Sequence, residues 1–97
     1  MSCTVVGWLS ILDQSAFEAY RDAVPDTLTP YQGELLGRVV HADTLANEHE
    51  LPAIHGIALL KFPSAEQAKA WAEGPEYQAI LPVRNQGIRL SLNAFTI

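Results

Sequence analysis

The chain has 97 residues, of which 48% are apolar and 18% are charged. This composition excludes the disordered classes and supports one hydrophobic core, so we expect a single domain spanning residues 1–97. Six Lys and Arg residues against eleven Asp and Glu residues give a net charge of −5, with no run of basic residues. Because phosphate backbones and anionic lipid surfaces repel such a chain, we expect neither a nucleic-acid partner nor a membrane partner.

The single cysteine and the short length of the apolar segments predict the cellular compartment of the protein. Cys3 is the one cysteine, which excludes an intrachain disulfide and a cysteine-based zinc site. The apolar stretch at residues 5–12 contains Gly7 and Ser10 and lacks a preceding basic region, so it indicates a strand and not a signal peptide. No other segment approaches the roughly 20 apolar residues of a membrane-spanning helix. These features predict a cytoplasmic protein.

The first predicted element is a strand at residues 4–12, which is rich in Val, Leu, Ile and Trp. Asp13 follows it and can cap a helix. A start at Ser15, with Glu18 completing a capping box, is the alternative. Either start predicts a helix directly after the strand.

The helical region carries one apolar and aromatic stripe. Its members recur at spacings of three and four: Phe17, Tyr20, Val24, Leu28 and Tyr31. Pro25 removes a backbone donor inside this region, so we expect a kink or a break at residues 24–26, which would divide the region into two helices. Gly33 marks the exit into a second strand at residues 34–41.

A polar connection at residues 43–53 leads to the clearest strand, at residues 54–62. Ser64 and Gln67 are spaced as a capping box for the next helix. The buried side of that helix is expected to consist of Ala68, Trp71 and Ala72.

In the last third of the chain, the sequence predicts the end of this second helix, a short helical turn and a final strand. Gly74 and Pro75 stop the helix and begin a short helical turn, which Pro82 is expected to close. Residues 87–97 alternate apolar and polar side chains, as a half-buried strand does. The order β, α, β, β, α, β predicts an α+β fold of the ferredoxin-like βαββαβ type, a sandwich of helices on an antiparallel sheet.

The first and third strands carry bulky apolar residues on both faces, whereas two helices can cover only one face. Leaving the other face exposed would produce a larger apolar patch than monomers usually show. The polar face of the last strand, with Arg89, Ser91 and Asn93, weakens this argument. We expect a homodimer in which a partner sheet covers the second face.

Several short motifs resemble one known family. They are Tyr20-Arg21, Ala23-Val24-Pro25, Tyr31-Gln32-Gly33, Phe62-Pro63-Ser64, Ala70-Trp71 and Pro75-Glu76-Tyr77-Gln78-Ala79-Ile80, followed by Pro82 and Arg84. The pattern resembles domain of unknown function family 1330 over nearly the whole chain, and residues 62–84 are its most specific part. The resemblance implies a dimeric ferredoxin-like α+β barrel, in which two sheets pack face to face. It implies no chemistry.

The chain departs from that family's pattern in two places. Gln32 stands where a second glycine is common. Residues 47–52 replace a Gly-Asp pair followed by an aromatic residue.

Three histidines lie on or between the second and third predicted strands, with Glu48 and Glu50 nearby. His41 and His55 flank a strand connection and are secondary candidates for ligand contacts, whereas His49 need not point the same way. Imidazoles and carboxylates can bind zinc or iron, but these spacings match no metal motif, so we predict structural or solvated histidines and no metal.

Aromatic residues and arginines from the two helical regions are the main candidates for a ligand site. They are Tyr20, Arg21, Tyr31, Trp71, Tyr77 and Arg84. An aromatic pocket with a guanidinium group suits a small planar acid, since Arg can hold a carboxylate with two hydrogen bonds. The alternative is that aromatics at helical spacing form core and that the arginines pair structurally.

Three hypotheses about function follow. The first is a homodimeric domain that binds a small, partly apolar, anionic molecule between helices and sheet. The second is a cofactor-free enzyme of the monooxygenase or isomerase type that uses general acid–base chemistry on the same pocket. The third is a structural dimerisation module without a ligand. The sequence carries no phosphate-binding loop, serine-nucleophile elbow or paired-cysteine motif, so we expect no cofactor.

Overall fold

The computed structural model describes residues 2–39 and 43–96. Its elements are β1 (Cys3–Ile11), α1 (Gln14–Leu28), a 3-10 helix η1 (Thr29–Tyr31), β2 (Glu34–Val39), β3 (Gly56–Phe62), α2 (Ala65–Glu73), α3 (Pro75–Gln78), α4 (Leu81–Gly87) and β4 (Ile88–Thr96). The strands form one antiparallel sheet in the order β2-β3-β1-β4. This order requires two interleaved crossovers, and it confirms the predicted α+β fold of the ferredoxin-like type.

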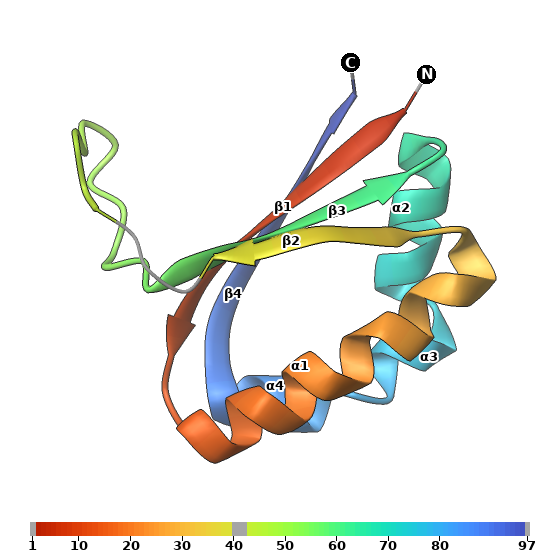
Figure 1. Ribbon diagram of the computed structural model, residues 1–97, viewed down its shortest axis with the longest axis horizontal. Helices are drawn as coiled ribbons and strands as arrows, with labels where there is room; N and C mark the ends of the chain where they lie inside the picture. The colour runs from red at the N-terminus through yellow and green to blue at the C-terminus, as the bar shows by residue number, and fades with distance from the viewer. Residues whose placement is uncertain (1, 40–42, 97) are drawn as a thin grey trace.

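The helices cover one face of the sheet and leave the other face uncovered within the described ranges (Figure 1). Residues 43–55, before β3, reach out on the side away from the helices, and the start of β1 lies beside the end of β4 (Figure 1). No helix in residues 2–39 and 43–96 is long and apolar enough to cross a bilayer.

The hydrophobic core lies between the sheet and the helices because strand side chains alternate between the two faces. On β1, Cys3, Val5 and Leu9 are buried, and their neighbours along the strand are half-buried. Leu60 and Phe62 of β3 lie beside Val5 and Cys3 in the register and share their face. The helices add their own buried residues: Phe17, Tyr20, Leu28, Ala68, Trp71 and Tyr77.

Two of the predicted helix caps are present. Asp13, and not Ser15, is the N-cap of α1, and its Oδ2 accepts from the backbone N of Ala16 at 2.8 Å. Ser64 caps α2, and its Oγ accepts from the backbone N of Gln67 at 3.3 Å. Gln67 does not return a hydrogen bond, because its buried Oε1 has no partner among the described residues. Ser64 is therefore an ordinary N-cap, and the capping box is incomplete.

Of the two predicted alternatives at residues 24–26, a kink or a break, the break does not occur, because α1 continues through Pro25 to Leu28. An interior proline costs about 3 kcal/mol locally. The residues on either side compensate for it: Val24 and Leu28 pack on the core, and Thr27 Oγ1 donates to the backbone O of Val24 at 2.6 Å. Tertiary packing outweighs the local preference here.

The prediction that Pro82 closes the helical segment is also wrong. Pro82 lies in the first turn of α4, where the missing N–H would have had no helical partner in any case. Gly87 ends this helix against the start of α1, and its backbone O accepts from the N atoms of Leu12 and Asp13 at 2.7 and 3.1 Å. A Cβ at Gly87 would lie 2.5 Å from the backbone N of Phe17, so the contact requires glycine.

The uncovered face of the sheet is apolar at its centre. Val6 pairs with Leu59 and Trp8 pairs with Ile57 across β1 and β3, and all four side chains are half-buried. Along β4, the polar side chains occupy this face, as the alternation predicts. The connection at residues 43–54 lines a groove beside Trp8 and Ile57.

Candidate functional site

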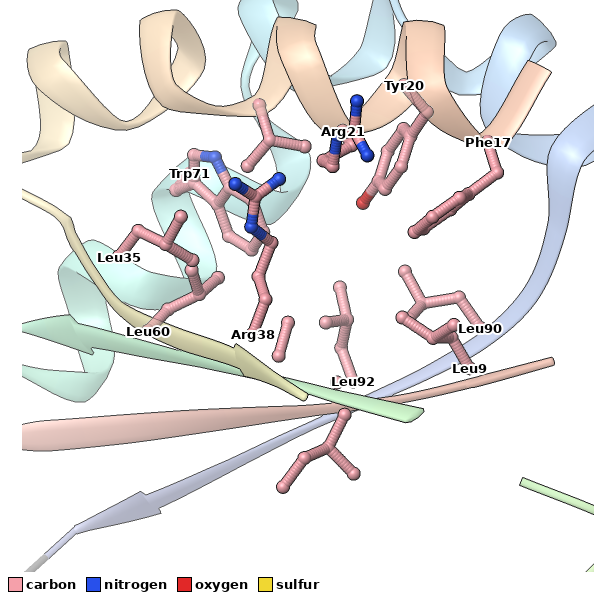
Figure 2. A pocket seen from close by; sticks show the side chains of 14 residues that line it. Leu9, Phe17, Tyr20, Arg21, Leu35, Arg38, Leu60, Trp71, Leu90 and Leu92 are labelled. Carbon is pink, nitrogen blue, oxygen red and sulfur yellow. The ribbon is translucent and has the colours of Figure 1, made fainter. Parts of the chain in front are cut away.

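A cleft opens between α1 and the sheet, and Figure 2 shows its lining. Its cavity volume is about 50 Å³, and the space widens to about 580 Å³ when the open mouth is included. The sheet contributes an apolar floor, and the helices contribute aromatic walls. The apolar lining consists mainly of Leu9, Leu60, Leu90, Leu92, Phe17 and Trp71. Such a cavity favours an apolar ligand body.

Two arginines from different elements extend into this cleft (Figure 2). Arg21 comes from α1; its Nε donates to Asp22 Oδ1 at 3.2 Å, and its guanidinium lies 5.9 Å from the Phe17 ring centre. Arg38 comes from β2, is exposed, and has no hydrogen-bond or ion-pair partner within residues 2–39 and 43–96. The described lining contains no carboxylate. In a chain of net charge −5, this is a local site of positive charge.

Arg38 is a residue that the sequence analysis missed. A β-bulge between Leu35 and Gly37 shifts the register of β2 against β3. As a result, Leu35 pairs with Leu60 and Arg38 pairs with Ala58, so both face the cleft. Simple alternation along the strand would place Leu35 and Arg38 on opposite faces. Gly37, inside the predicted strand at residues 34–41, is the sequence signal that could have indicated a bulge at this point.

Tyr20 and Tyr77 form a buried hydroxyl pair. Tyr20 of α1 lines the cleft and points into it (Figure 2), and its Oη lies 2.7 Å from Tyr77 Oη of α3. Arg84 of α4 donates from Nη1 to the same Tyr77 Oη at 3.2 Å. Burial, followed by the neighbouring Tyr77, raises the pKa of Tyr20 above its ordinary value of 10.0. Tyr20 is therefore a neutral phenol at physiological pH.

Trp71 lines one wall of the cleft and is also part of the hydrophobic core. Its side chain is 1% exposed, and its ring lies 4.4 Å from the Tyr77 ring centre and 5.5 Å from that of Phe62. Its Nε1 donates to Thr27 Oγ1 at 2.9 Å. Of the six predicted site residues, Tyr20, Arg21 and Trp71 line the cleft, whereas Tyr77 and Arg84 stand behind Tyr20.

Tyr31 does not line the cleft. It lies in η1, and its hydroxyl donates to Glu76 Oε1 at 2.5 Å. This hydrogen bond lowers the pKa of Glu76 below its ordinary value of 4.5 and raises that of Tyr31. The ring also packs on Gly74, where a Cβ would lie 2.1 Å from Tyr31 Oη. Tyr31 joins η1 to α3, which is a structural role.

The Tyr31–Glu76 bond predicts a pH-dependent stability. A carboxylate whose pKa is lowered on folding stabilises the fold above its unfolded pKa, and that contribution disappears as the pH falls through the folded pKa. Tyr31→Phe should therefore lower the melting temperature at pH 7 and have a smaller effect near pH 3. Melting curves across this range, with Glu76→Gln as the control, measure it. An equal effect at both pH values would contradict the assignment.

His55 makes a structural contact in the described part of the chain. His55 is exposed, and its Nδ1 accepts from the backbone N of Ile11 at 2.7 Å, which holds the end of β1 to the chain before β3. Ser10 Oγ and the Ala53 carbonyl make a second hydrogen bond at this junction. His55 lies outside the cleft, and His41 lies outside the described residues. In residues 2–39 and 43–96, no group of three His, Cys, Asp or Glu side chains is placed to hold a metal ion.

Solved structures share this fold at low sequence identity. A protein of unknown function from Rhodopseudomonas palustris, RPA0582, matches with a TM-score of 0.76 and 10% identity, over 97% of this chain and 80% of that one. SnoaB, a cofactor-independent oxygenase from Streptomyces nogalater, matches with a TM-score of 0.69 and 11% identity, over 99% and 92% of the two chains. A dimeric ferredoxin-like protein of unknown function from Thermobifida fusca matches with a TM-score of 0.65 and 14% identity, over 100% and 92%.

These identities show a shared fold and no shared activity. No curated protein matches the chain. One family model, described as Domain of unknown function (DUF1330), matches residues 4–95.

Proposed function

Because the chain belongs to the DUF1330 family, whose name assigns no activity, we propose from its own side chains that it binds a small, partly apolar carboxylate in the cleft. One observation carries the proposal: Arg21 from α1 and Arg38 from β2 both line a cleft floored by leucines. A guanidinium holds a carboxylate through two parallel hydrogen bonds, and the leucine floor accepts the apolar body.

Arg38 is suited to this role because it is exposed and has no hydrogen-bond or ion-pair partner in the described part of the chain. Arg21 shares its guanidinium with Asp22 only through Nε. The Nη atoms of both arginines remain available to an anion.

A cofactor-free enzyme on the same cleft is the second candidate. The SnoaB fold and the Tyr20 hydroxyl inside the cleft favour it. Proton abstraction, however, needs a base, and the described lining contains no His, Asp or Glu. Since its raised pKa keeps Tyr20 protonated, binding accounts for the residues better than base catalysis does.

We also propose that the protein is a homodimer. Val6, Trp8, Ile57 and Leu59 form an apolar centre on the face that no helix covers. The structural neighbour from Thermobifida fusca is a dimeric protein. A second sheet packed on this face would leave the ligand cleft, which lies on the helix side, within each subunit.

Binding of phenylbutyrate, followed by calorimetry or NMR, tests the ligand proposal. We expect phenylbutyrate to bind and its uncharged amide to bind more weakly. Arg38→Gln should weaken phenylbutyrate binding by about tenfold, because it removes a charge-assisted hydrogen bond.

Arg89→Gln is the matched control for this experiment. It removes the same charge from the other face of the sheet and should leave the affinity unchanged. Equal losses of phenylbutyrate affinity in Arg38→Gln and Arg89→Gln would show that the net charge of the protein, and not the position of the arginine, controls binding. That result, or no binding to the unmodified protein, would contradict the proposed site.

A further inference from the structure

The hydroxyl pair inside the cleft has a defined direction. Arg84 is a donor only, and its Nη1 donates to Tyr77 Oη at 3.2 Å. Tyr77 is 1% exposed, and the partners of its hydroxyl among the described residues are Arg84 and Tyr20. Since Arg84 cannot accept, the proton of Tyr77 has one acceptor in this part of the chain, which is Tyr20 Oη.

The opposite direction is disfavoured by burial. If Tyr20 donated to Tyr77, the oxygen of Tyr77 would accept twice and its own proton would be left without an acceptor in the core. A buried donor without a partner costs about 1 to 3 kcal/mol. With Tyr77 as the donor, every group of the pair is satisfied except the Tyr20 proton, and that proton belongs to the residue that lines the cleft.

We propose that Tyr20 is a ligand-binding residue that donates a hydrogen bond to an acceptor oxygen of the ligand inside the cleft. Arg84 and Tyr77 are positioning residues, because they act only through Tyr20. Together with the arginines at the mouth, Tyr20 selects carboxylates that carry a second acceptor on their apolar body, such as a ketone. This inference rests on the proposed function and narrows its ligand class.

Electrostatics agree with a donor role. The pKa of Tyr20 is raised by burial and by Tyr77, so its proton is retained under all physiological conditions. The floor below Tyr20 is leucine, and the only polar side chains that line the described cleft besides Tyr20 are the two arginines. A ketone oxygen in this position therefore finds Tyr20 as its donor on the inner side of the cleft (Figure 2).

A matched ligand pair tests the inference. Benzoylpropionate is phenylbutyrate with its benzylic methylene oxidised to a ketone, so the two differ at one carbon. We expect the unmodified protein to bind the ketone about five- to tenfold more tightly, as one hydrogen bond allows. Tyr20→Phe should abolish this preference, so that the variant binds the two ligands with equal affinity.

Tyr77→Phe distinguishes the two directions of the hydroxyl pair. If Tyr77 donates to Tyr20, loss of the Tyr77 hydroxyl weakens Tyr20 as a hydrogen-bond donor. The preference for benzoylpropionate over phenylbutyrate should then fall. If Tyr20 donated to Tyr77, the substitution would release the Tyr20 proton and the preference would rise. Infrared spectra of bound benzoylpropionate with an isotope-labelled carbonyl give a direct readout: the stretch should lie at lower frequency in the unmodified protein than in Tyr20→Phe, where the hydroxyl donor is missing.

The outcomes separate this inference from the function on which it rests. Equal binding of both ligands, with no effect of Tyr20→Phe and no carbonyl shift, would overturn the role of Tyr20 and leave the arginine site intact. A rise in ketone preference in Tyr77→Phe would overturn the proposed direction. Binding of neither ligand would overturn both proposals.

Discussion

Replacing Trp71 with alanine should lower the free energy of unfolding by about 3 to 5 kcal/mol, as removal of a large buried aromatic does. The side chain is 1% exposed and contacts the rings of Tyr77 and Phe62. Its removal would leave a cavity at the centre of the helix–sheet interface and would also leave Thr27 Oγ1 without a donor. Urea denaturation followed by circular dichroism measures the loss.

Thr27→Val separates packing from hydrogen bonding in this cluster. It keeps the shape of Thr27 but removes the acceptor for Trp71 Nε1 and the donor to the Val24 backbone. We expect a loss of about 1 to 3 kcal/mol, since a buried indole N–H is left unpaired. If Trp71→Ala lowered the free energy of unfolding by less than Thr27→Val does, the aromatic cluster would not be the main source of stability at this interface.

The second large effect concerns assembly. Leu59→Lys should convert the proposed dimer into a monomer, because it places an unpaired charge at the apolar centre of the uncovered face. Leu59 lies beside Val6 in the sheet register, on the side away from the helices. Light scattering coupled to size exclusion should show the mass of two chains for the unmodified protein and the mass of one chain for the variant.

Ala70→Lys is the matched control for assembly. It adds the same charge to an exposed position of α2, on the helix layer, and Glu66 one turn earlier accommodates it. This variant should remain dimeric. A monomeric unmodified protein at micromolar concentration, or equal dissociation of both variants, would contradict a dimer through the open face.

Most of the fold could be predicted because its signals are local. Residues 4–12 predict a strand by their Val, Leu, Ile and Trp composition, residues 87–97 predict one by alternation, and Asp13 and Ser64 mark helix starts by their side-chain chemistry. Where local signals failed, tertiary contacts decided. Helix α1 passes through Pro25 because its neighbours pack on the core, and Pro82, which the sequence analysis interpreted as an end, lies in the first turn of α4.

The candidate site was only partly predictable. The spacing of Tyr20 and Trp71 on their helices predicts that both face the sheet, and Arg21 next to Tyr20 reaches the same cleft. Tyr31 continues that spacing, yet it lies in η1, where its hydroxyl turns to Glu76. The spacing rule holds only while the helix continues.

The amino-acid sequence by itself determined the order of the strands, the buried faces of the helices and of the last strand, and the acidic balance of the chain. Those properties depend on the period of apolar residues and on composition, which need no knowledge of distant contacts. Only the tertiary structure decided which charges share the cleft. Arg38 reaches the cleft because a bulge in β2 reverses its face, and Tyr20 becomes a donor because α3 and α4 bring Tyr77 and Arg84 behind it. Both depend on pairing between segments far apart in the chain, which a local pattern does not encode.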